Sequence, residues 1–329
     1  MQALMEKGDK KQGRRWSAAY HFGINERHIS SNSGHTKSEV SLSQTQNGSG
    51  YEEVLDLQDN EILPILKSYH GITTHHISIH HPCEEIEKQP GEYITIELED
   101  LNDAKQREEA IAVTGDCLKQ VIDGLKLSGT RALIVGLGNQ EITADSLGPM
   151  AAKQVIVTAH LHRLQEEELA QGTSEVAVIV PGVMGQTGLE TAEFVQAVAR
   201  QFRPDFVIAI DALATRSIER INRVIQISDT GIQPGGGVGN HRKVLNEELV
   251  QAPVVAIGVA TVVSIEALID QVLSTIQCDD YQKVMEHIHY QESYQMVVTP
   301  KEMDEEVKHL TEVISTAINQ VLHPRFSQM

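Results

Sequence analysis

Short apolar runs rich in valine and isoleucine alternate with helical segments, and this alternation constrains the fold more than any other feature of the chain. The runs have no polar face, as expected of parallel strands that helices cover on both sides. They span residues 132–135, 176–180, 206–210, 224–227 and 254–259. Residues 93–98 alternate like a further strand, and residues 106–126 have helical periodicity. The pattern predicts an α/β fold, a doubly wound, mostly parallel sheet with helices on both faces.

The amino-acid composition of the 329-residue chain argues against several classes of function. It has 46 Asp and Glu against 27 Lys and Arg, a net charge of −19, whereas binding to nucleic acid phosphates needs a concentrated positive surface. Three cysteines are too few for a disulfide framework. No run of about 18 apolar residues occurs, and no apolar stretch follows the basic N-terminus. We therefore expect a cytoplasmic protein that binds neither nucleic acid directly nor a membrane.

Residues 1–50 differ in composition from the rest of the chain. They are rich in Ser, Gln, Asn, Gly and His and show no sustained apolar period. They also carry a small positive charge, whereas the remaining residues are strongly acidic. This predicts a polar, propeptide-like tail over residues 1–50 and a single α/β domain over residues 51–329.

Polar and glycine-rich segments follow each of the five apolar runs. In an open parallel sheet, ligands bind beyond the carboxyl ends of the strands, so we expect five successive loops to form one site. The segments span residues 136–149, 181–188, 211–217, 228–240 and 260–261. Two of them contain an aspartate near an expected helix start, Asp145 and Asp211.

Asp145 and Asp211 have two interpretations. Each could cap the N-terminus of a helix, a common structural role of aspartate. Two aspartates on adjoining loops instead favour a carboxylate pair. Two close carboxylates cannot both ionise at low cost, so one keeps a proton and the other acts as a base. Such a pair activates water and protonates a leaving amine, while the alternative use of the same groups is to bind a metal ion that activates the water.

Other short motifs give little support to further chemistry. Gly136-Leu137-Gly138 resembles the start of a dinucleotide fingerprint, but the full pattern needs glycine where the chain has Glu141. Asp229, followed by Thr and Gly, is interpreted as a turn residue. The patterns of serine hydrolases, zincins and P-loop NTPases do not occur.

A histidine cluster invites a metal-binding interpretation. Its members are His75, His76, His80 and His81. In a strand, His76 and His80 face one way and His75 and His81 the other, which splits the ligand set. A solvated edge strand is therefore favoured, and we expect neither a bound metal nor another cofactor.

Two further segments have local signals. Gly235, Gly236 and Gly237 form a loop that ends at His241; glycine permits positive φ or close approach to a substrate, with a structural turn as the alternative. For His241, a place facing the site and a structural role both stay open. Before the last helix, Thr299-Pro300-Lys301-Glu302 predicts a capping box with Thr299 at the N-cap.

Several long segments resemble the germination (spore) protease family of endospore-forming bacteria. They are Gly136-Leu137-Gly138-Asn139, Asp145-Ser146-Leu147-Gly148-Pro149 and residues 181–188, 205–220 and 227–243. The likeness covers roughly residues 90–270 and returns at residues 297–304. Because these motifs are long and follow one another in the right order, the resemblance is more specific than any single short pattern.

The resemblance implies an atypical aspartic endopeptidase that starts the degradation of the small acid-soluble proteins coating DNA in dormant spores. It places the acid pair on Asp145 and Asp211. It further implies a homotetramer located in the spore core and a sheet shared with hydrogenase-maturation peptidases. The expected substrate-binding or supporting residues lie on the adjoining loops and are Met184, Gly185, Thr187, Arg216, Gly235, Gly236, Gly237 and His241.

The family is made as a zymogen that cleaves its own N-terminal segment. In this chain Ser38-Glu39-Val40-Ser41-Leu42 loosely matches the family's cleavage sites, which predicts cleavage between Val40 and Ser41. The alternative is an unrelated tail, since the Arg-Thr-Asp-Leu-Ala stretch typical of the family's N-terminus is missing. The region at residues 276–296 is also shorter than expected of the family.

Two rival functions remain open at this point. One is a metal-dependent maturation-type peptidase on the same sheet, which a chelator would inhibit. The other is a non-catalytic homologue that acts as a binding protein and never cleaves a spore coat protein.

Overall fold

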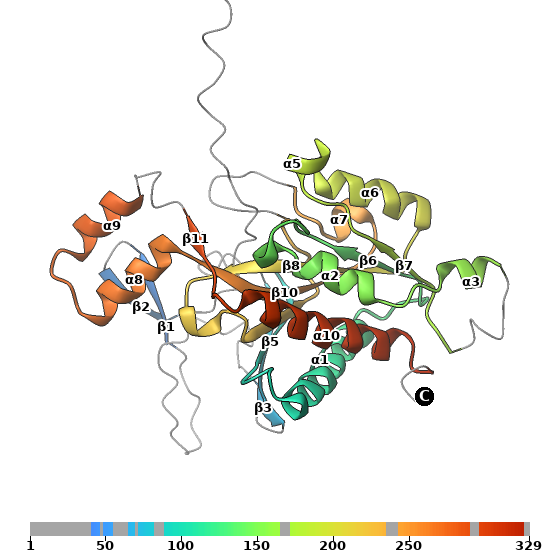
Figure 1. Cartoon of the computed structure of the whole chain (residues 1–329), viewed down its shortest axis with the longest axis horizontal. Helices are drawn as coiled ribbons and strands as arrows, with labels where there is room; N and C mark the ends of the chain where they lie inside the picture. Colours follow the sequence, from blue (N-terminus) through green and yellow to red (C-terminus); the bar gives the residue numbers. More distant parts are fainter. Residues whose placement is uncertain are drawn as a thin grey trace, which may run out of the picture.

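The computed structural model describes residues 41–46, 49–54, 65–69, 72–81, 89–164, 172–234, 243–289 and 296–325. Nine strands in this part of the chain form one sheet in the order β3-β4-β5-β9-β10-β8-β6-β7, with β11 paired to β10. Helices cover both faces of the sheet (Figure 1). This arrangement confirms the predicted doubly wound α/β fold.

The parallel strands occupy one half of the sheet. In spatial order they are β10 (Val254–Ser264), β8 (Phe206–Thr215), β6 (Ala132–Gly136) and β7 (Val176–Ile179). Nearly every residue of β6, β8 and β10 is buried. Burial on both faces explains why these strands are rich in Val and Ile throughout rather than at alternate positions.

The other half of the sheet is antiparallel. It contains β9 (Val224–Ser228), β5 (Gly91–Glu97), β4 (Ile72–Ile79) and β3 (Ile65–Tyr69). The expectation that residues 224–227 form a parallel strand is therefore wrong. An apolar run indicates that both faces of a strand are buried, and this can occur whether the neighbouring strands are parallel or antiparallel to it. As a consequence, the chain leaves β9 at the opposite edge of the sheet from the loops that follow β6, β7, β8 and β10.

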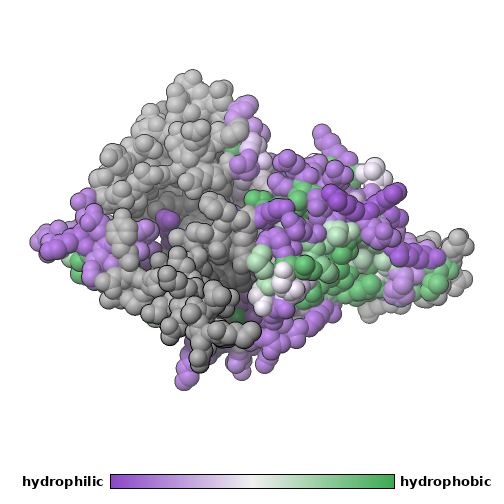
Figure 2. Space-filling view, turned by 90° about the horizontal axis from the view of Figure 1, so that it is seen from above, coloured by the Kyte–Doolittle hydropathy of each residue, from purple (hydrophilic) through white to green (hydrophobic). Residues whose placement is uncertain are grey.

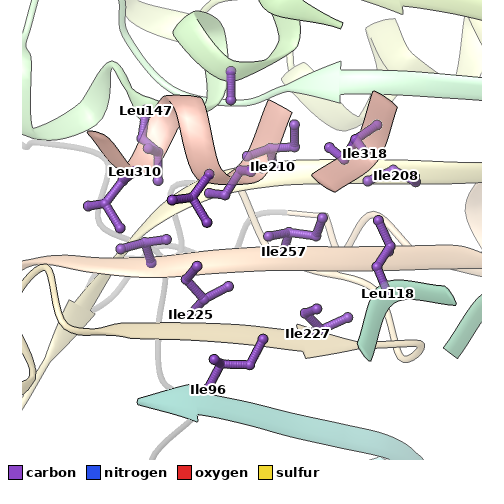
Figure 3. Packing of buried hydrophobic residues seen from close by; sticks show 14 of the residues in the cluster. Ile96, Leu118, Leu147, Ile208, Ile210, Ile225, Ile227, Ile257, Leu310 and Ile318 are labelled. Carbon is purple, nitrogen blue, oxygen red and sulfur yellow. The ribbon is translucent and has the colours of Figure 1, made fainter. Parts of the chain in front are cut away.

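One face of the sheet carries the larger core. It is covered by α1 (Ala104–Gly124), α2 (Leu147–Gln154) and α10 (Met303–Leu322). Figure 3 shows Leu147 of α2 and Leu310 of α10 near Ile210 of the sheet. The three side chains are fully buried, and burial of an aliphatic side chain stabilises a fold by about 1.5–3 kcal/mol.

The opposite face is covered by α6 and by shorter segments. The helices are α3 (Ala159–Arg163), α6 (Thr191–Phe202) and α7 (Glu247–Val250). Val195 and Ala199 of α6 pack in the same cluster as Val207 and Ala209 of β8. The remaining elements are η2 (Thr143–Asp145), α5 (Met184–Thr187), η3 (Ile218–Arg220), α8 (Ile265–Thr275), α9 (Tyr281–His289) and β11 (Val297–Val298). No helix in the described part of the chain is long and apolar enough to cross a membrane.

The N-terminal described strands form a separate antiparallel pair. β1 (Ser41–Gln46) pairs with β2 (Ser49–Val54), so β2 spans the predicted boundary at residue 50. The sequence between the two strands, Asn47-Gly48, is a dipeptide that favours tight hairpins. Residues 1–40 lie outside the described residues, and the division of the chain at residue 50 stays a prediction.

The histidine-containing strand is internal. β4 lies between β3 and β5, and His75 and His76 are buried. The expectation of a solvated edge strand is wrong, because β3 pairs with the edge that β4 was expected to expose. His75 Nε2 lies 3.5 Å from Glu97 Oε1, and His76 Nε2 lies 3.2 Å from Thr74 Oγ1.

The last helix begins later than predicted. α10 starts at Met303, with Glu302 at the N-cap position. Thr299 instead donates its hydroxyl hydrogen to Thr261 O at 3.0 Å. The predicted capping box is therefore wrong, because Thr299 directly follows β11, whose pairing with β10 places it beside that strand.

Close packing of Gly148 against the sheet gives a first prediction. A Cβ atom at this position would lie 2.2 Å from Leu137 O and 2.3 Å from Ile210 O. Both are backbone atoms that cannot move aside. We expect Gly148→Ala to lower the free energy of unfolding by about 1–3 kcal/mol, measured by urea denaturation. In the control Gly124→Ala, no atom lies within 4 Å of the added carbon, so that variant should keep its stability; equal losses in both variants would contradict the packing argument.

Candidate active site

Asp211 lies inside a strand. β8 continues through this residue to Thr215, and Asp211 is only 3% exposed. The expectation of a loop position, and with it the helix-cap alternative, is wrong for this residue. Ala209 and Leu213 pack on the α6 face, whereas Ile210 and Ala212 pack on the face of α1 and α10. Because side chains alternate along a strand, the Asp211 carboxyl faces the α6 side.

Asp145 ends the short turn that precedes α2. It is the last residue of η2 and is 7% exposed. Its Oδ2 accepts a hydrogen bond from Asn139 N at 2.8 Å, and Ser146 occupies the N-cap position of α2. The carboxylate therefore accepts its hydrogen bond from the preceding loop, which follows β6, rather than from the helix that follows it. A backbone N–H donated to a carboxylate favours its ionised form.

Glycines let the Asp145 turn pack tightly on the end of β6. Gly138 has φ of 111°, and a Cβ atom there would lie 2.2 Å from Asp145 O. Leu137 N, one residue earlier, donates to Ile210 O at 2.8 Å. The same loop therefore contacts Asp145 and the residue directly before Asp211, which brings the two aspartates together.

The electrostatics of Asp211 reflect this proximity. Burial raises the pKa of the Asp211 carboxyl well above its ordinary value of 3.8, and the neighbouring charge of Asp145 raises the pKa further. The hydrogen bond from Ala212 N to Asp211 Oδ1, at 2.9 Å, acts in the opposite direction. Two neighbouring carboxyl groups, one of them strongly desolvated, form an arrangement in which the desolvated group binds its proton more tightly than an ordinary aspartate.

The loop after β7 lies beside the Asp145 turn. Gln186 Nε2, in α5, donates to Asn139 Oδ1 at 2.7 Å. Met184 is 38% exposed, and no atom lies within 4 Å of a carbon added at Gly185. The Thr187 hydroxyl donates to the carbonyl oxygen of Val183 or of Leu189, both at 3.3 Å. Thr187 therefore shapes the loop, while Met184 and Gly185 lie on its exposed surface.

Of the remaining predicted site residues, only Arg216 and Ser41 belong to the part of the chain that the structure describes. Arg216 is exposed and directly follows the last residue of β8. Val40, Gly235, Gly236, Gly237 and His241 lie outside the described residues. Ser41 is the first residue of β1.

The segment that leads into the glycine loop does not begin where the sequence predicted. Because β9 is antiparallel to β10, the chain leaves β9 at the opposite end of the sheet, so the expectation of five loops at one end is wrong. Residues 260–261, also expected in a loop, lie inside β10. After the loop, Lys243 Nζ lies 2.6 Å from Glu193 Oε1 in the first turn of α6. The chain thus returns along the face toward which Asp211 points.

Sequence reasoning missed three supporting residues. Asn139 and Gln186 link the two loops beside Asp145, and Thr261 holds the turn itself by donating to Ala144 O at 2.7 Å. All three belong to segments that follow apolar runs, so their position was a usable signal. Within the described residues, no three His, Cys, Asp or Glu side chains lie close enough to hold a metal ion together.

A shallow apolar hollow lies away from the aspartates. It is formed by α3, α6 and β7, with Phe194 and Phe202 in its wall. Figure 2 shows apolar surface gathered on the side of the molecule that carries α6 in Figure 1. None of the predicted site residues lines this hollow.

Comparison with known proteins gives a consistent result. A family described as "Germination protease" matches residues 43–292. The chain is 36% identical over 295 residues to the germination protease of Bacillus subtilis (strain 168), covering 73% of this chain and 80% of that protein. It is 38% identical over 261 residues to the germination protease of Clostridium tetani (strain Massachusetts / E88), covering 72% and 80%.

Among solved structures, the chain is similar to the [NiFe] hydrogenase maturation protease HycI from Thermococcus kodakarensis KOD1. The TM-score is 0.32 at 20% identity, over 60% of this chain and 99% of that chain. A similarity at this level carries no argument about activity. The family match and the relatives at 36% and 38% identity cover most of the sequence, and they show that this chain belongs to the germination protease family of aspartic-type peptidases.

Proposed function

We propose that this protease hydrolyses peptide bonds with Asp145 and Asp211 and thereby starts the degradation of small acid-soluble spore proteins. The observation that carries the proposal is the desolvated Asp211 carboxyl beside Asp145, at the edge where the loops after β6, β7 and β8 meet. The substrate class, the spore interior as location and the homotetramer follow from the family resemblance. Because the substrate is a DNA coat protein, an acidic enzyme with a charge of −19 need not bind DNA itself.

The surroundings of the two carboxyl groups support different roles. Burial disfavours the charged form of Asp211 and raises its pKa, so we assign Asp211 the role of general acid. Asp145 accepts a hydrogen bond from Asn139 N, and we assign it the role of base. In the proposed reaction Asp145 takes a proton from water as the water oxygen attacks the peptide carbonyl carbon, and Asp211 gives its proton to the leaving nitrogen as the C–N bond breaks. Proton transfer from Asp145 to Asp211 then restores the starting state.

Replacement of either aspartate tests the pair. Asp145→Asn and Asp211→Asn keep the size of the side chain but remove the proton exchange, so each variant should cleave a small acid-soluble spore protein about 10³-fold more slowly or worse. Asp229→Asn is the matched control, since Asp229 is a half-buried aspartate that accepts a hydrogen bond from Glu92 N at 2.7 Å. It should retain cleavage.

The same assay separates the rival functions. Near-normal cleavage by either active-site variant would contradict the pair. Loss of wild-type cleavage with a chelator, restored by added metal, would favour a metal-dependent peptidase. Absence of any cleavage by the wild-type protein would favour a non-catalytic homologue.

The raised pKa of Asp211 predicts a pH dependence of stability. Between the ordinary value of 3.8 and the raised pKa, the folded state binds more protons than the unfolded state. The free energy of unfolding contributed by this group is therefore highest below pH 3.8 and falls as the pH rises toward the raised pKa. Asp211→Asn should remove this fall, which makes the variant more stable than the wild-type protein at neutral pH.

Urea denaturation over a series of pH values measures this difference. Subtracting the variant curve from the wild-type curve cancels the groups whose pKa is lowered, such as Glu97. A difference that stays constant with pH would show that Asp211 ionises normally in the folded protein.

We also infer self-cleavage between Val40 and Ser41. Ser41 begins β1, so this bond lies directly before the β1–β2 pair. Mass spectrometry of protein held at mildly acidic pH should reveal a new N-terminus at Ser41 in the wild-type protein and not in Asp211→Asn. A fully active enzyme that retains Met1 would contradict this inference.

A further inference from the structure

A residue of β10 forms a hydrogen bond to the turn that carries Asp145, although β8 lies between β10 and β6, the strand that precedes this turn. Thr261 Oγ1 donates to Ala144 O at 2.7 Å. That carbonyl belongs to the same peptide group as Asp145 N, which donates to Ile142 O at 2.8 Å. The peptide group leading into Asp145 is thus bound at both ends, which fixes the direction in which the Asp145 side chain leaves the backbone.

Thr261 is an extra residue in the strand. Ala260 pairs with Leu213 and Val262 pairs with Ala214, so Thr261 has no opposite residue in β8. Such a β-bulge redirects a side chain and is common beside active sites. A bulge also takes backbone groups out of the ladder, and here Thr299 Oγ1 donates to the Thr261 carbonyl oxygen. The bulged residue is 1% exposed, so its hydroxyl bond is shielded from competing water.

The same strand also fixes Asp211. Gly258, three residues before Thr261, pairs directly with Asp211 in the parallel ladder. A carbon added at Gly258 would lie 2.3 Å from Leu213 Cδ1, so only glycine fits there without displacing that side chain. β10 therefore contacts both halves of the pair, Asp211 through the backbone ladder and Asp145 through the hydroxyl of Thr261.

We propose that Thr261 is a positioning residue, whose hydroxyl holds Asp145 at the separation from Asp211 at which the two carboxyl groups share one proton. This inference rests on the proposed function of the pair. Misplacement of a catalytic group by about 1 Å can reduce a rate about 10²-fold. A freed Asp145 turn would also weaken the electrostatic effect of Asp145 on Asp211.

The test compares Thr261→Val with Thr261→Ser. Valine keeps the shape and suits a strand but has no hydroxyl, so kcat for cleavage of a small acid-soluble spore protein should fall about 10- to 100-fold with KM unchanged. Serine restores the hydroxyl and should recover most of kcat. Independently of activity, the pH range over which Asp211 lowers stability should move to lower pH in Thr261→Val, because the charge of Asp145 raises the pKa of Asp211 less from a greater distance.

Thr158→Val provides the matched control. Thr158 is a fully buried threonine whose hydroxyl donates to Ser174 O and accepts from Val176 N, at the start of β7 rather than at the site. This variant should lose stability but keep kcat and the position of the pH-dependent step. If it loses kcat and shifts that step as Thr261→Val does, the positioning role is wrong.

The outcomes also separate this inference from the proposed function. If Asp145→Asn and Asp211→Asn both cleave substrate, the proposed function fails. If those variants are inactive while Thr261→Val keeps wild-type kcat and pH dependence, or Thr261→Ser fails to restore them, only the role of Thr261 is overturned.

Discussion

Desolvation of one carboxyl group is the physical constraint on which the site depends. Asp211 lies within a strand whose faces are covered by helices, so water cannot stabilise its charge from either side. A lone buried carboxylate at this place would only weaken the fold. The neighbouring Asp145 turns the same burial into a difference in proton affinity between two otherwise identical side chains, which is what acid–base chemistry at one site needs.

Small residues make that proximity geometrically possible. Gly138 lets the turn of Asp145 lie on the end of β6, and Gly148 lets α2 approach the backbone of β6 and β8. β10 completes the arrangement, because Gly258 pairs with Asp211 and the Thr261 hydroxyl donates a hydrogen bond to Ala144 O. The candidate site is therefore built mainly by the sheet itself, and the loop after β7 is joined to it through Gln186 and Asn139.

Much of this organisation could be predicted from the sequence, since long apolar runs indicate buried strands and glycine-rich segments mark where they end. The meeting of Asp145 and Asp211 followed from that reasoning. The direction of β9 did not, because burial on both faces looks the same in either direction. Asp211 was expected after its strand, since a charge usually interrupts an apolar run. The bulge at Thr261 has no local signal, because it arises from pairing with a strand more than forty residues away in the sequence.

The contact between Thr299 and Thr261 has a consequence for the order of synthesis. β11 and α10 come from the last part of the chain, yet Leu310, Ile314 and Ile318 of α10 belong to the main core. While the ribosome is still making this segment, the sheet lacks one of its covering helices and the bulge lacks its partner. We therefore expect assembly of the proposed aspartate pair to be completed only when the C-terminal helix has packed against the sheet.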